Sequence, residues 1–246
     1  MSASSPGAIW QREDLTEAYL SERQILMPLV EIQEDLIRRL LQRQQHPLRR
    51  FLDIGSGDGA MSELVLEVEP QAEPVLVDFS GPMLERAERR MARTSVPWQG
   101  VRGDLSDAGW RDGLPAGVYS AAISAFAIHH LPAARKRALF AELFDLLEPG
   151  AMFLNMDYVS VVGPLVGLFD EQTDANAIAA ERVRGGGRTD EQIKCEHAQD
   201  GDEDRPDSVE DQLQWLRAAG FTEGEVHFKW AEAAVFGAVK PIGGNH

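Results

Sequence analysis

Apolar residues recur with the period of a helix along the first fifty positions of the chain, and this pattern predicts two helices there. The second predicted helix follows Pro28, and its apolar face consists of Leu29, Ile32, Leu36, Ile37, Leu40 and Leu41. Pro28 suits the first turn of a helix, and the His46-Pro47 pair is expected to end it. We therefore predict an N-terminal helical cap over residues 1–48.

From Arg49 onward the pattern changes, because short apolar runs now alternate with amphipathic segments. The apolar runs predict strands near residues 50–54, 74–78, 97–102, 118–124 and 151–157. The segments between them predict helices near 59–69, 82–93 and 132–147. Strands that alternate with helices of this length form right-handed βαβ units and a parallel sheet.

The alternation stops after Tyr158, where a stretch rich in glycine and acidic residues begins and continues to about Asp207. A helix is predicted near 208–219, and two short apolar runs after it meet closely at Ala231-Glu232, as in an antiparallel hairpin. The predicted fold is therefore α/β, with a Rossmann-like seven-stranded sheet that is mostly parallel, a C-terminal antiparallel hairpin, and helices on both faces. The hairpin is not expected of a plain dinucleotide domain.

The length and composition are those of an ordinary globular enzyme. A chain of 246 residues forms one large domain, or one domain with an elaboration. No apolar run approaches the roughly 20 residues of a membrane span, and the first residues lack the features of a secretory signal. The single cysteine, Cys195, fits a reducing compartment. We expect a cytoplasmic protein with no membrane partner.

The charge is strongly acidic, with 24 basic and 40 acidic residues and a net charge of -16. Proteins that bind nucleic acid concentrate basic residues, so this balance disfavours a nucleic-acid partner. Residues 170–211 contain 14 acids and 5 bases, a net charge of -9. We interpret about 160–207 as an acidic insertion. It is either a lid with Arg184–Arg188 (RGGGR) as its hinge or a solvated loop.

A glycine-rich loop follows the first predicted strand, in the sequence RRFLDIGSGDGAMSELV from Arg49 to Val65. The spacing Gly55-x-Gly57-x-x-Ala60 meets the fingerprint of dinucleotide sites, which hold a pyrophosphate. Asp53 before the loop and Asp58 inside it would repel a phosphate. S-adenosylmethionine (SAM) carries an ammonium and a sulfonium and no phosphate, so the acids favour SAM over a dinucleotide.

Acids also end the next two predicted strands. Asp78 stands where a carboxylate binds the hydroxyls of a ribose, which both ligand classes contain. Phe79 and Met83 offer two sides to an adenine, although ordinary core packing is the alternative. Asp104 and the N–H group of Leu105 are expected at the adenine edge.

Five segments resemble, in order and spacing, the class I SAM-dependent methyltransferases: FLDIGSGDG, VLVDFSGPMLERAERR, VRGDLSD, ISAFAIHHL and ELFDLLEPGAMFLNMDY. The resemblance covers residues 25–158 and resumes at 208–240. It implies a SAM-binding methyltransferase domain over 49–246, methyl transfer from SAM, and S-adenosylhomocysteine (SAH) as product. The implied cofactor-binding residues are Asp53, Gly55, Ser56, Gly57, Gly59, Asp78, Phe79, Met83, Asp104, Leu105, Ser124, Ala125 and Phe126.

The acceptor is less well defined. The chain lacks both the metal-binding acids of catechol-type enzymes and an Asn/Asp-Pro-Pro-Tyr/Phe sequence after the fourth strand. The second absence disfavours methylation of nucleobase or glutamine amino groups. We predict methylation of O, N or S on a small-molecule acceptor by a monomer or homodimer. The alternatives are an enzyme similar to tRNA-modifying methyltransferases and a non-catalytic SAM-binding scaffold subunit.

His129 and His130 follow the fourth predicted strand and are the catalytic candidates, because a neutral imidazole accepts a hydroxyl proton. The alternative is that one of them packs under the next helix. A metal site formed by the two histidines and Asp157 is a third interpretation with less support, and we predict no metal.

A few other residues are weaker candidates for acceptor contacts. Three arginines of the insertion either meet an acceptor carboxylate or offset neighbouring acids: Arg182, Arg184 and Arg188. Three residues near the N-terminus either line the pocket or pack in the core or an interface: Trp10, Tyr19 and Arg23.

Overall fold

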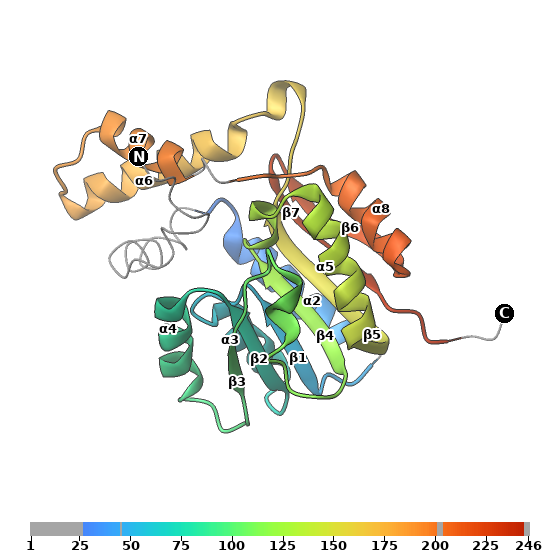
Figure 1. Ribbon diagram of the computed structural model, residues 1–246. Coiled ribbons are helices and arrows are strands. Elements are labelled where there is room, and N and C mark those ends of the chain that lie inside the picture. Colours follow the sequence, from blue (N-terminus) through green and yellow to red (C-terminus); the bar gives the residue numbers. More distant parts are fainter. Residues whose placement is uncertain (1–26, 45, 201–203, 244–246) are drawn as a thin grey trace.

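The computed structural model describes residues 27–44, 46–200 and 204–243, and its centre is one seven-stranded sheet (Figure 1). The strand order is β3-β2-β1-β4-β5-β7-β6. β1 to β5 are parallel, and β7 runs antiparallel between β5 and β6. The strands are β1 (Arg50–Ile54), β2 (Glu73–Asp78), β3 (Gln99–Arg102), β4 (Tyr119–Ala125), β5 (Leu147–Tyr158), β6 (Thr222–Trp230) and β7 (Ala233–Val239). The predicted sheet, including its C-terminal hairpin, is confirmed.

Helices cover both faces of this sheet, as predicted. α5 (Ala133–Leu146) and α8 (Val209–Ala219) pack together over one face. α2 (Val30–Arg43), α3 (Ala60–Val68) and α4 (Gly81–Met91) cover the other. Side chains of a strand point to the two faces in turn, so Phe51 joins the core beside α2 and α3 while Leu52 joins the core beside α5 and α8. Both residues are fully buried.

β5 begins four residues before its predicted start at 151. The added residues include Pro149 and Gly150, which in sequence are typical of a turn. Here the register of β4 and β5 shifts between Tyr119 and Ala121, so an irregularity in the pairing accommodates them. Gly150 lies at φ 88° and donates its N–H to the carbonyl of Lys240.

The N-terminal cap is described in part. The helix predicted after Pro28 is α2. Its Ile37 and Leu41 are buried in the core that α2 and α3 form with one face of the sheet. The first predicted helix, with Trp10, Tyr19 and Arg23, lies outside the described residues. The boundary at residue 48 stays a prediction.

The acidic insertion is helical rather than a solvated loop. It contains α6 (Leu168–Arg184) and α7 (Asp190–Asp200), which lie against each other and extend away from the sheet (Figure 1). Gly185 ends α6 in the left-handed conformation that a C-terminal cap requires. A lid function for the insertion stays a prediction.

Among the described residues, no helix combines the length and apolar character of a membrane span.

Candidate functional site

The predicted site residues gather at the carboxyl ends of β1, β2, β3 and β4. β1 has β2 on one side and β4 on the other, so the strand order reverses at β1. Open α/β sheets bind their ligands in the crevice at this type of position. The glycine loop leaves β1 at this edge and leads into α3.

The three glycines of the loop all adopt left-handed backbone, with φ of 65° at Gly55, 52° at Gly57 and 79° at Gly59. At Gly55 space is also limiting, because a Cβ atom there would lie 2.2 Å from the Cβ of Ala127. The loop therefore packs directly on the segment that follows β4. The N–H group of Ser56, also a predicted site residue, donates to the carbonyl of Val77 in β2.

Asp78 holds the loop against the end of β2. Its Oδ2 accepts a hydrogen bond from the N–H of Gly57 and its Oδ1 accepts one from the N–H of Ser80, each at 2.8 Å. Burial raises the pKa of Asp78 more than these two hydrogen bonds lower it. The N–H of Phe79 also bonds to Asp78, so backbone groups fix the carboxylate in place.

Asp53 lies beneath the loop and is 1% exposed. Its Oδ2 accepts a hydrogen bond from the Ser62 hydroxyl at 2.6 Å, whereas its Oδ1 accepts none from the described residues. Burial raises the pKa of Asp53 to about 7, because the ionised form loses its hydration. A cation near Oδ1 would favour the ionised form.

Asp58 does not contribute the repulsion that the sequence suggested. Its side chain pairs with the guanidinium of Arg90, which also donates to the carbonyl of Asp58 and to Glu63. The pairing neutralises Asp58, so this part of the argument against a pyrophosphate was wrong. Asp53 alone remains as an unneutralised acid at the loop. Local sequence gave no sign of the pairing, since Arg90 lies 32 residues away on α4.

Of the residues predicted around the adenine, two lie close to the loop. A Cβ atom on Gly57 would lie 3.9 Å from the sulfur of Met83, and one on Gly55 would lie 3.9 Å from Cδ1 of Leu105. Phe79 is half-buried. Asp104 is exposed, and its Oδ1 accepts a hydrogen bond from the N–H of Ser106 within its own turn.

The end of β4 forms the neighbouring wall. The Ser124 hydroxyl donates to the carbonyl of Ile54 at 2.8 Å and so ties β4 to β1. Ala125 and Phe126 are half-buried, and Phe126 lies at φ 50°, a strained position for a residue with a side chain. The strain is thus located at one of the residues that the resemblance implies for cofactor binding.

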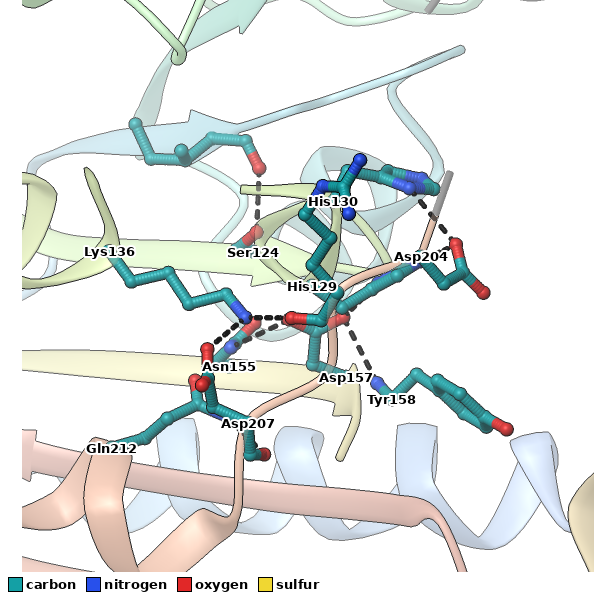
Figure 2. A network of polar contacts seen from close by, with 12 residues as sticks. Ser124, His129, His130, Lys136, Asn155, Asp157, Tyr158, Asp204, Asp207 and Gln212 are labelled. Carbon is teal, nitrogen blue, oxygen red and sulfur yellow. Dashed lines mark hydrogen bonds and ion pairs between the residues drawn. The ribbon is translucent and has the colours of Figure 1, made fainter. Parts of the chain in front are cut away.

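The two histidines form the short helix η3 (Ile128–His130), directly after this wall. Nδ1 of His129 lies 2.6 Å from Oδ1 of Asp157, and its Nε2 lies 3.3 Å from Oδ1 of Asp204 (Figure 2). Burial lowers the pKa of His129, but the two carboxylates outweigh it and raise the pKa to about 9. A protonated imidazole has no lone pair to accept a proton, so this arrangement favours a structural role for His129.

His130 is more accessible. Its side chain is 28% exposed, against 8% for His129, and its Nδ1 lies 3.1 Å from Oδ1 of Asp204. Of the two histidines it has the geometry better suited to accept a proton from an acceptor. Catalytic roles for both histidines stay predictions.

Asp204 was missed in the sequence, because nothing distinguishes it from its acidic neighbours in DGDEDRPD. The N–H of Arg205 donates to the carbonyl of His129 at 3.0 Å, which places Asp204 beside the histidines. Fully buried Lys136 of α5 donates to the carbonyl of Arg205 and to Asp207 (Figure 2). Burial would raise the pKa of Asp204, but hydrogen bonds from the two histidines hold it well below its usual range.

Other candidates lie elsewhere. Arg182 pairs with Asp190 and Arg188 pairs with Glu181, so both contact acids of the insertion itself. A groove of about 600 Å³ lies between the start of α2 and α6, with Leu29, Ile32 and Val183 among its lining residues. None of the predicted cofactor residues lines this groove.

Comparison with known proteins supports the resemblance to methyltransferases. Residues 51–150 match the family model described as "Methyltransferase domain". Over these residues the chain is similar to that family, and its fold is the Rossmann-like fold of class I methyltransferases. The resemblance found in the sequence is thereby confirmed. The match to this methyltransferase domain includes the glycine loop, Asp78, Asp104 and both histidines, whereas the insertion and the hairpin lie outside it.

Curated methyltransferases resemble parts of the chain, and two of them are described here. Trans-aconitate 2-methyltransferase of Acidovorax sp. (strain JS42) is 32% identical over 115 residues, which are 46% of this chain and 40% of that protein. Malonyl-[acyl-carrier protein] O-methyltransferase of Anoxybacillus flavithermus (strain DSM 21510 / WK1) is 31% identical over 67 residues, which are 27% of this chain and 26% of that protein. The match thus spans less than half the length of either relative.

The fold resembles that of human N-acetylserotonin methyltransferase, solved in complex with SAM. The TM-score is 0.65 at 14% identity, and the likeness covers 98% of this chain and 60% of the human one.

Proposed function

We propose that the protein is a SAM-dependent methyltransferase that methylates an O, N or S atom of a small-molecule acceptor. The observation that best supports this is Asp53, a buried carboxylate beneath the glycine loop whose Oδ1 accepts no hydrogen bond from the described residues. Its position suits an ammonium group such as the one on the methionine part of SAM. SAM supplies a methyl group activated by its sulfonium.

The remaining residues fit the rest of the cofactor. The glycine loop lets the backbone approach the ligand closely, because it presents no side chain at Gly55, Gly57 or Gly59. The Asp78 carboxylate, fixed at the end of β2, suits the ribose hydroxyls. Met83 and Leu105, which both lie against the loop, suit the faces of an adenine.

The acceptor is expected beyond the end of β4, on the side where the insertion joins the histidines. Orientation of the acceptor in a pocket from which water is excluded supplies much of the rate gain in reactions of this type. His130 is the residue we assign to the proton of a hydroxyl acceptor. One of the two curated relatives is named for trans-aconitate, and the net charge of -16 disfavours nucleic acid, so both support a small-molecule acceptor.

Calorimetric titration of the protein with SAM, SAH and NAD tests the cofactor. We expect SAM and SAH to bind and NAD not to bind. Asp78→Ala should weaken SAM binding by about 1–3 kcal/mol, because hydrogen bonds to a charged group are lost. Asp145→Ala, which removes an exposed acid of α5, is the matched control and should leave the affinity unchanged. Binding of NAD alone would contradict the proposal.

Incubation with methyl-labelled SAM and a panel of acceptors tests the transfer. Label on a hydroxyl, amine or thiol compound of low molecular mass is the expected result. Label on tRNA would favour the tRNA-modifying alternative instead. SAM binding without label on any acceptor of the panel would favour the scaffold alternative.

A further inference from the structure

Three side chains from distant parts of the sequence converge beside the end of β4. The ligand atoms of His129, His130 and Asp204 all lie within 4.8 Å of one another. Oδ1 of Asp204 lies 3.3 Å from Nε2 of His129 and 3.1 Å from Nδ1 of His130. Zinc binds imidazole nitrogen and carboxylate oxygen at about 2.0–2.2 Å in tetrahedral sites, so neighbouring ligand atoms there are separated by about 3.3 Å. The two measured separations are close to that value.

Asp157 supports His129 from behind. The Nδ1 of His129 lies 2.6 Å from Oδ1 of Asp157, a fully buried carboxylate. Asp157 is itself fixed, because it accepts hydrogen bonds from the Asn155 amide and from the N–H of Tyr158 (Figure 2). Histidines that bind metals typically donate their second ring N–H to a carboxylate in this way, which directs the other nitrogen toward the ion. Here the other nitrogen is Nε2, on the side of Asp204 and His130.

Asp204 is held in position by contacts other than those to the histidines. The N–H of its neighbour Arg205 donates to the carbonyl of His129, and the ammonium of Lys136 binds both the Arg205 carbonyl and Asp207. The N–H of Ser160 also donates to the carbonyl of Asp207. The carboxylate is therefore brought to the histidines by the backbone around it. Such prior positioning lowers the cost of assembling a metal site.

We propose that His129, His130 and Asp204 bind one Zn²⁺ ion, with Asp157 orienting His129. The sequence led us to expect no metal and to treat Asp157 as a possible ligand, whereas the structure places Asp157 behind His129 and supplies Asp204 as the third ligand. Three protein ligands leave a fourth position on zinc for water or for an oxygen of the acceptor. Zinc would displace the proton from the ligand nitrogen of each histidine, so a zinc-bound water rather than His130 would then accept the proton of a hydroxyl acceptor. Zinc binding itself does not depend on the proposed methyl transfer, so the two can fail separately.

Zinc binding is measured on the full chain after treatment with a chelator, by equilibrium dialysis with metal analysis. Visible absorption of the Co²⁺-loaded protein reports the ligand geometry. We expect one Zn²⁺ per chain and a tetrahedral Co²⁺ spectrum. His130→Ala and Asp204→Asn, which remove or weaken one ligand each, should each lower the affinity at least about 100-fold. Asp157→Asn should lower it about 10- to 100-fold, the usual effect of losing such a supporting carboxylate.

The chain offers two controls. His46 forms a comparable contact with Glu148, at 2.6 Å from Nε2, and His46→Ala should leave zinc binding unchanged. Cys195→Ser removes an exposed thiol and should also leave it unchanged. Circular dichroism confirms that each variant is folded. The proposal is overturned if the wild-type chain binds no stoichiometric zinc, if both His130→Ala and Asp204→Asn bind it as wild type does, or if Cys195→Ser alone abolishes binding.

Discussion

Asp53 is a single buried residue that lowers the stability of the folded chain as the pH rises. Its pKa in the folded chain is about 7, against an ordinary value of 3.8. The folded state therefore binds more protons than the unfolded state between about pH 4 and pH 7, and the free energy of unfolding falls as the pH rises through that window. Above pH 7 the full penalty is present, and three pKa units correspond to about 4 kcal/mol.

We predict that Asp53→Asn stabilises the ligand-free protein at pH 8 by about 1–4 kcal/mol, because the neutral amide avoids this penalty. Urea unfolding of both proteins at pH 5 and pH 8 measures the effect. The advantage of the variant should be much smaller at pH 5, and calorimetry should show weaker SAM binding. An equal advantage at both pH values would mean that ionisation of Asp53 is not its source.

Gly55 is constrained by space as well as by its backbone. We predict that Gly55→Ala lowers the free energy of unfolding by about 1–3 kcal/mol more than Gly163→Ala does, because its Cβ would overlap Ala127. Gly163 is the matched control, since its φ of 69° is close to the 65° of Gly55 but open space surrounds it. Denaturant unfolding of both variants gives the comparison. Equal losses would show that the segment after β4 moves aside.

Among the elements, α6 depends on a residue of the hairpin. Buried Glu232, between β6 and β7, accepts hydrogen bonds from the N–H groups of Gly167 and Phe169 at the start of α6. Its negative charge also suits the positive end of the helix. The hairpin therefore anchors the insertion to the sheet.

We predict that Glu232→Ala weakens this anchor by about 1–2 kcal/mol, the usual effect of losing such a cap. Amide hydrogens of 168–184 should then exchange about 5- to 30-fold faster, as measured by mass spectrometry, while those of β1 and β4 stay protected. Glu225→Ala, which removes an exposed acid of the same hairpin, is the control. Unchanged exchange in α6 would show that other contacts hold it.

The elements also show what the sequence could predict. The strands and helices from Arg50 to Met91 lie within a few residues of their predicted positions, because the period of burial is a local property. The glycine loop was found for the same reason, since its conformation depends on adjacent residues. The charge pairs were not found. Asp58 meets Arg90, and Asp204 meets the histidines 75 positions earlier, and such contacts depend on how distant segments pack.

At the scale of the whole molecule, the sheet joins the two apolar cores into one unit. Residues of β1, β4 and β5 contribute to both cores, one on each face. The predicted cofactor residues lie at the ends of β1 to β4, so a ligand bound there contacts the centre of this unit. Its binding energy should therefore stabilise the sheet and its covering helices together rather than one loop.

We predict that SAH at about 100 times its Kd stabilises the fold by about 2.7 kcal/mol. For a chain of this size, that corresponds to a rise in Tm of roughly 5–10 °C, measured by calorimetry or circular dichroism. NAD at the same concentration should give no rise, and Asp53→Asn should reduce the rise given by SAH because the ammonium loses its carboxylate. A shift of equal size in wild type and Asp53→Asn would place SAH elsewhere on the molecule, since the cradle beneath the glycine loop would then not be its binding site.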